Sequence, residues 1–83
     1  MLPARRIVPL STLGPGRRRG RIARIEGGPW VQRLLDLGMV PETWVEFVRR
    51  APLGDPLAYR IRGTCVALRR REASAVFVEV PEE

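Results

Sequence analysis

The sequence has no histidine, no lysine and a single cysteine, Cys65, among its 83 residues. One cysteine excludes an internal disulfide, and the nine carboxylates are scattered, whereas transition metals prefer imidazole, thiolate or clustered carboxylate ligands. The serine and threonine hydroxyls have no histidine to act as a base, and the glycine-rich stretches lack the lysine of a phosphate-binding loop. We therefore expect no catalytic site, no metal site and no cofactor in this chain, and we do not expect an enzyme.

Long apolar runs are also missing. The first residues lack the apolar segment of a signal peptide, and no stretch approaches the roughly 20 apolar residues of a membrane span. This absence predicts a cytoplasmic protein. A chain of this length forms one small domain with a thin core, so we expect a single domain over residues 1–83 with its core at about 9–80.

Arginine dominates the charge of the chain. All 15 basic residues are arginine, they face nine acidic residues, and the formal net charge is +6. Such a charge favours anionic partners such as nucleic acid, phosphate-rich surfaces or acidic protein faces, but it says nothing about the fold. Genome composition or a hot habitat explains the exclusive use of arginine equally well.

One stretch has apolar residues at helical spacing. Trp30, Leu34 and Leu37 recur at intervals of four and three residues, which predicts one buried helical face. Pro29 suits the first turn of a helix, and Gly38 suits the left-handed position just past its end. We expect this short segment to be the only substantial helix, held in place by packing.

The remaining segments alternate in the manner of β-strands. The expected strands are Gly20–Glu26, Thr43–Ala51, Leu57–Arg62, Thr64–Leu68 and a last one around Val76, Val78 and Val80. Ile22 and Ile25 differ in parity, which indicates a bulge in the first strand. Gly63 suits a tight turn, and Gly54 lies in a stiff loop between two prolines. About five strands with one short helix between the first and second long strands predict a mainly β fold, a small SH3-like barrel closing on itself.

Several motifs together resemble the ferrous iron transport protein A family, FeoA. They are Pro9–Gly16 (PLSTLGPG), Arg33–Pro41 (RLLDLGMVP), Ala51–Pro56 (APLGDP), Gly63-Thr64 and Val66–Arg69 (VALR). The similarity runs from about Leu10 to Val80. It implies an SH3-like barrel in the bacterial cytoplasm that is an accessory of FeoB, the membrane ferrous iron transporter with a guanine-nucleotide-binding domain.

The residue after Pro41 departs from the family pattern. The family usually has glycine there, and this chain has Glu42. Glycine allows the positive φ of a type II turn, whereas glutamate favours a type I turn. We therefore expect a slightly different approach to the strand that follows.

Binding is the chemistry that remains for this chain. The candidate partner contacts are the apolar residues Met39, Val40 and Leu53, the acidic Asp55, and the basic residues Arg49, Arg50, Arg60 and Arg62. Arginine makes bidentate contacts to carboxylates, and an exposed leucine in a stiff loop lowers the entropy cost of binding. Asp55 also suits turn hydrogen bonding, and Cys65 suits a small packing position. Open strand edges make a homo-oligomer a further candidate.

Nucleic-acid binding is the alternative that the composition leaves open. Trp44 and Phe77 lie among arginines and could stack on bases. The other aromatic residues fall at core-facing or helix positions. We therefore rank this alternative behind contact with a FeoB-type transporter.

Overall fold

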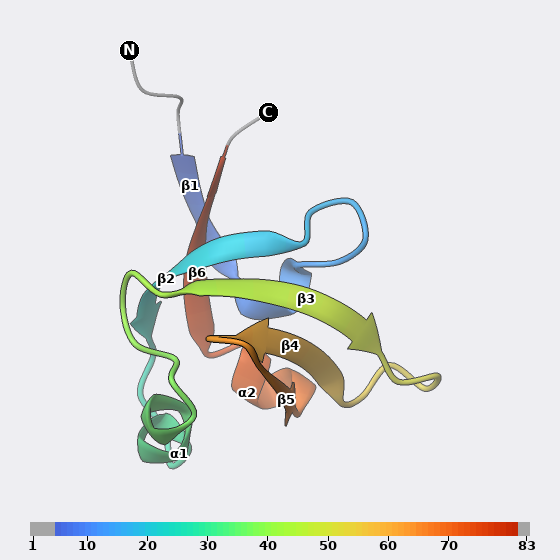
Figure 1. Cartoon of the computed structure of the whole chain (residues 1–83). Coiled ribbons are helices and arrows are strands. Elements are labelled where there is room, and N and C mark those ends of the chain that lie inside the picture. The colour runs from blue at the N-terminus through green and yellow to red at the C-terminus, as the bar shows by residue number, and fades with distance from the viewer. Residues whose placement is uncertain (1–4, 82–83) are drawn as a thin grey trace.

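The computed structural model describes residues 5–81 and contains a strongly bent antiparallel sheet (Figure 1). The sheet has six strands in the order β1-β6-β2-β3-β4-β5. The strands are β1 (Arg5–Pro9), β2 (Arg19–Ile25), β3 (Trp44–Arg50), β4 (Leu57–Ile61), β5 (Thr64–Leu68) and β6 (Val76–Pro81). A 3-10 turn η1 (Leu10–Thr12) follows β1, and the helices are α1 (Val31–Asp36) and α2 (Arg70–Ala73).

The expected closed barrel of about five strands is wrong in two respects. Arg5–Pro9 forms an additional strand that pairs with β6 along its whole length. Apolar and polar residues do not alternate clearly in this segment, so its sequence does not indicate a strand. The segment is a strand because it pairs with the distant C-terminal strand. In addition, β1 and β5 stand at the two ends of the strand order, so the sheet is not closed.

The core lies on the concave face of the sheet, where the alternating apolar residues of the strands meet. Ile22, Val45, Tyr59, Ile61 and the valines of β6 are buried there. The loop before β2 contributes Leu10 and Leu13, which are fully buried. The Tyr59 hydroxyl donates a hydrogen bond of 3.3 Å to the carbonyl oxygen of Leu10, which ties this loop to β4.

The bulge expected in β2 is confirmed. The pairing with β6 shifts register between Ile22 and Arg24. The strand also passes very close to β6 at Gly20, where a Cβ atom would lie 2.8 Å from Cγ2 of Val78. Only glycine fits at this crossing, because a contact below about 3 Å forces the backbone or its neighbour to move.

The helices are short and depend on tertiary contacts. Leu34 on α1 is fully buried, and Trp30 and Leu37 pack partly against the core. The arginine-rich stretch after β5 forms α2, a single helical turn that is shorter than α1. No helix among residues 5–81 combines the length and the apolar character needed to span a membrane.

Two tight turns use residues at positive φ. Glu42 has a φ of 71°, and the amide of Thr43 donates to the carbonyl of Val40 at 3.3 Å. Pro41 and Glu42 are therefore the central residues of a type II turn, and the expectation that glutamate changes the turn type is wrong. Between β4 and β5, Arg62 and Gly63 have φ values of 51° and 77°, as a type I′ hairpin requires.

Candidate functional site

The structure divides the candidate partner residues between two surfaces at opposite ends of the β3–β4 pair (Figure 1). The "loop surface" consists of Arg49, Arg50, the 51–56 loop and Arg69 to Arg71. The "turn surface" consists of Arg19, Trp44, Glu46, Arg60 and Arg62. Met39 is fully buried and belongs to the core, and Val40 is half-buried beside it.

The 51–56 loop is held in one conformation by hydrogen bonds. The amide of Gly54 donates to the carbonyl of Ala51 at 2.8 Å, and the amide of Ala51 donates to the carbonyl of Pro56 at 3.0 Å. Arg70 clamps the loop from α2, because its backbone amide donates to Oδ1 of Asp55 at 2.9 Å and its guanidinium to the carbonyl of Gly54 at 3.0 Å. Asp55 thus has the turn-bonding role that the sequence allowed.

Leu53 is the tip of this loop. Its relative exposure is 97%, the highest of the exposed large hydrophobic residues in the described part of the chain. Hollows lie on both sides of the loop, one lined by Arg49, Arg50 and Pro52 and the other by Asp55 and the arginines of α2. The tip therefore projects between two groups of cations.

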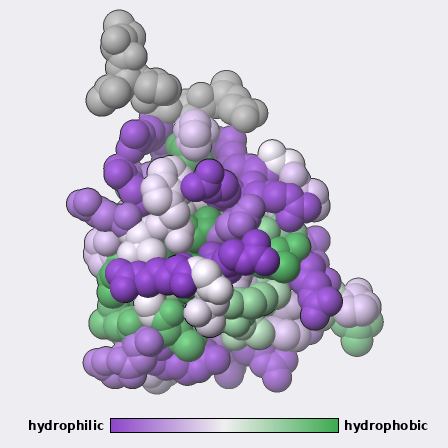
Figure 2. Space-filling view, viewed as in Figure 1, coloured by the Kyte–Doolittle hydropathy of each residue, from purple (hydrophilic) through white to green (hydrophobic). Residues whose placement is uncertain are grey.

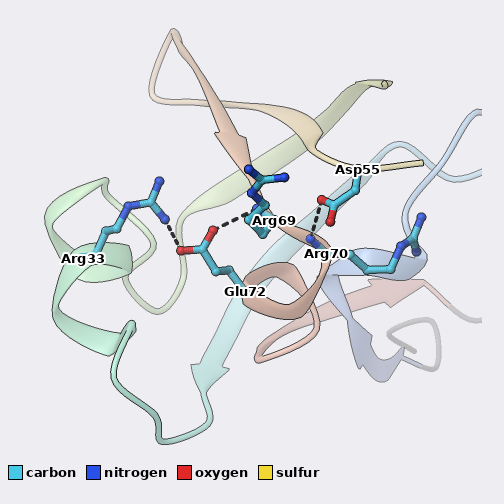
Figure 3. Close-up of polar contacts among 5 residues, drawn as sticks. All are labelled: Arg33, Asp55, Arg69, Arg70 and Glu72. Atoms are coloured by element: carbon cyan, nitrogen blue, oxygen red, sulfur yellow. Dashed lines mark hydrogen bonds and ion pairs between the residues drawn. The ribbon is translucent and has the colours of Figure 1, made fainter. Parts of the chain in front are cut away.

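Glu72 connects the two helices beside the loop surface (Figure 3). One carboxylate oxygen accepts the backbone amide of Arg69 at 2.8 Å, and the other accepts the guanidinium of Arg33 on α1. Little in the sequence indicates this role, because a lone glutamate after three arginines is typical of a solvated polar segment. Its side chain is only 11% exposed, so the ion pair fixes α1 to α2.

The loop surface carries unneutralised positive charge. Within residues 5–81, none of the guanidinium groups of its five arginines has a carboxylate oxygen within 4.0 Å. Burial raises the pKa of the Tyr59 hydroxyl well above its usual value, and the charges of Arg70 and Arg50 partly oppose that rise. Both groups of cations are thus close enough to act on the same buried hydroxyl.

Trp44 is the centre of the turn surface. It is 52% exposed, and the Arg19 guanidinium lies over its ring at 5.0 Å from the centroid. It lines two hollows, one with Arg60 and Arg62 and the other with Arg21 and Glu79. The sequence placed Trp44 on the opposite strand face from Val45 and Phe47, but only the pairing of β2 with β3 brings Arg19 beside it.

The carboxylates on this face are already paired. Glu46 pairs with Arg60 at 3.4 Å, and Glu79 pairs with Arg21 at 3.0 Å. Arg62 and Arg19 have no acidic partner within 4.0 Å in the described part of the chain. The turn surface therefore combines an exposed indole with surplus positive charge.

The potential metal ligands and the single cysteine are the other reactive groups among residues 5–81. No group of three or more cysteine, aspartate or glutamate side chains in this range converges to hold a metal ion. Cys65 is exposed on β5, so the expected packing role is wrong. Its side chain lies on the outward face of the edge strand.

The sequence model of the FeoA domain matches residues 8–80. A Porphyromonas gingivalis protein described as a fusion of Fe(2+) transport protein A and Fe(2+) transporter FeoB is 42% identical over 60 residues. The match covers 71% of this chain and 7% of that protein, so the chain spans only a small part of this curated relative.

Several solved structures are similar to this chain, among them the following two. The iron(II) transport protein A of Clostridium thermocellum is 42% identical with a TM-score of 0.80, over 88% of this chain and 45% of that one. The zinc complex of FeoA from Stenotrophomonas maltophilia, a prokaryotic SH3 domain protein, is 27% identical with a TM-score of 0.73, over 87% of this chain and 94% of that one.

The open antiparallel sheet and its similarity to that SH3 domain protein define a small SH3-like domain. The chain belongs to the FeoA domain family.

Proposed function

We propose that this chain is a cytoplasmic accessory of ferrous iron transport that binds a FeoB-type transporter through the turn surface. The supporting observation is the Porphyromonas gingivalis relative, in which a protein A segment and a FeoB segment share one polypeptide. Fusion keeps two domains at high effective concentration, which benefits domains that act on each other. In this proposal ferrous iron is the transporter's cargo, and the chain itself has no enzymatic role.

The composition of the turn surface suits a protein partner. Tryptophan and arginine are the residues most enriched where a few side chains dominate the binding energy. Trp44 offers a large apolar area, and the Arg19 guanidinium lies over its ring. Arg62 has no carboxylate partner among residues 5–81, so it is free to contact an acidic group of the transporter.

Regulation by such a contact requires a preference between states of the transporter. A partner shifts a conformational equilibrium only by the difference in its affinities for the two states. We therefore expect the affinity of this chain to differ between the guanine-nucleotide-bound and nucleotide-free forms of the transporter.

The test is binding of the purified chain to a detergent-solubilised FeoB-type transporter, with and without guanine nucleotide and with an RNA competitor. We expect saturable binding that changes with nucleotide and survives the RNA. Trp44→Ala should weaken it by at least about tenfold, the usual effect of losing a central aromatic contact.

The matched control is Arg6→Gln, which removes a charge from an exposed residue of β1 outside both surfaces. It should leave binding nearly unchanged, whereas Arg62→Gln should weaken it. Absence of transporter binding, with salt-sensitive RNA binding in its place, would instead support the nucleic-acid alternative, because phosphate contacts release counterions.

A further inference from the structure

The loop surface has a layered arrangement of apolar and charged groups. Leu53 projects farthest and is 97% exposed, next to the exposed Pro52. Arg49 and Arg50 lie behind it at the end of β3, and Arg69 to Arg71 lie behind it at α2. Figure 2 shows the end of this loop as a knob with a hydrophobic tip and hydrophilic surface beside it.

We propose that the loop surface binds the anionic headgroup layer of a phospholipid membrane, with Leu53 inserted into the interfacial region. Anionic headgroups lie where the arginines would meet the membrane surface, and the acyl boundary lies just beneath them. An apolar tip beyond a group of cations matches this order of layers. The net charge of +6 adds attraction to the same surface.

The stiffness of the loop makes this insertion favourable. Arg70 clamps both Gly54 and Asp55, so the tip is already held in its projecting conformation. A preformed loop loses little conformational entropy when it binds. The acid closest to the tip, Asp55, accepts the backbone amide of Arg70 and opposes the approach of anionic lipid less than an unbonded carboxylate.

A protein pocket is a poorer match for the same residues. The centre of a protein interface is depleted of charge and needs contiguous apolar area. Here the arginine-lined hollows reach the base of the tip, and Pro52 and Leu53 are the only exposed apolar residues of the loop. A membrane provides negative charge on every side of an inserted leucine, and this complementarity favours lipid.

The inference does not depend on the proposed contact with the transporter. The loop surface and the turn surface lie at opposite ends of the β3–β4 pair, so both could be occupied at once (Figure 1). A domain held at the membrane by its loop would present Trp44 away from the lipid.

The experiment is co-sedimentation of the full chain with vesicles of phosphatidylcholine alone and of equal parts phosphatidylcholine and phosphatidylglycerol. We expect binding to the anionic vesicles only, falling as salt is added. Leu53→Ser should reduce it about tenfold, because the leucine loses its transfer into the apolar interface. Arg49→Gln and Arg71→Gln should each reduce it about fivefold. Leu53 and both arginines are exposed, so these variants should keep the fold.

Arg6→Gln is the matched control, since it removes the same charge outside the loop surface. If it weakened vesicle binding as much as Arg71→Gln, the attraction would be general and the loop surface would not be the site. If anionic vesicles were not bound, while Leu53→Ser weakened binding to the transporter in detergent, the loop would enter a protein pocket and the inference would be wrong. Failure of Trp44→Ala to affect the transporter would refute only the proposed function.

Discussion

The ion pair between Arg33 and Glu72 should hold α1 against the rest of the domain. The helix has six residues, too few to be stable alone, and one of them, Leu34, is fully buried. Removing the cation by Arg33→Gln leaves the carboxylate of Glu72, whose side chain is 11% exposed, with the Arg69 amide as its partner. The Arg33→Gln variant therefore leaves the nearly buried negative charge of Glu72 without its cationic partner.

The size of the effect follows from the exposure of the two partners. A buried charged acceptor that loses its partner costs about 1–3 kcal/mol or more, and Arg33 is 52% exposed, so we expect about 1–2 kcal/mol for Arg33→Gln. Glu72→Gln keeps an oxygen for the Arg69 amide and leaves Arg33 in water, which should cost about 1 kcal/mol. The double variant should cost little more than Glu72→Gln, because a neutral amide needs no cation. The coupling energy is then about 1–2 kcal/mol, close to the full cost of Arg33→Gln.

Urea unfolding monitored by circular dichroism measures these changes in unfolding free energy. They are seen as shifts of the midpoint urea concentration when the m-value is unchanged. A loss of 1 kcal/mol should also lower the melting temperature by about 4–8 °C in a domain of this size. The control pair is Arg60 and Glu46, whose side chains are both more exposed and should couple by only about 0.2–1 kcal/mol. A coupling for Arg33 and Glu72 no larger than that of the control pair would refute the tethering of α1 through Glu72.

Three further predictions concern stability. Because burial raises the pKa of the Tyr59 hydroxyl, the contribution of Tyr59 to stability should be constant below about pH 10 and fall above it, as the unfolded chain releases the phenolic proton that the folded chain retains. In Tyr59→Phe, alkaline urea titrations should show a much smaller fall, and an equal fall would exclude this cause. Glu42→Gly should stabilise the domain by about 1 kcal/mol in urea, because it relieves a non-glycine residue at φ 71°; a loss of stability would contradict the assigned strain. Gly20→Ala should lower the melting temperature by several degrees because its Cβ would collide with Val78, and unchanged melting would mean that the two strands separate at no cost.

The sequence predicted the central strands because their alternation is local. Leu57, Tyr59 and Ile61 are buried in turn with exposed or half-buried neighbours, as their spacing indicated. The bulge in β2 was visible in the same way from the parity of Ile22 and Ile25. Each of these features depends on residues a few positions apart.

Features set by distant parts of the chain were missed. Strand β1 forms because it pairs with β6, which is distant in the sequence. The sheet is open because β1 and β5 each pair with only one other strand. Met39 was a candidate partner contact after the helix, yet the structure places it in the core. Glu42 adopts positive φ because the flanking turn is fixed by β2, whose Ile22 carbonyl accepts the Glu42 amide at 2.7 Å.

The candidate surfaces were partly predictable. The sequence identified Leu53 as an apolar loop tip and the arginines as candidate basic contacts, because both features depend on local composition. It did not divide these residues between two ends of the β3–β4 pair, since that division arises from strand pairing. It also could not place Arg19 over Trp44, two residues separated by the whole of α1.

Hydrogen exchange of this chain with and without a FeoB-type transporter in detergent tests the central claim most directly. We predict slower exchange of backbone amides around Trp44 to Glu46 and around Arg60 to Arg62, with no change in the 51–56 loop when lipid is absent. Protection that spares these segments, or unchanged exchange at saturating transporter, would contradict a contact through the turn surface.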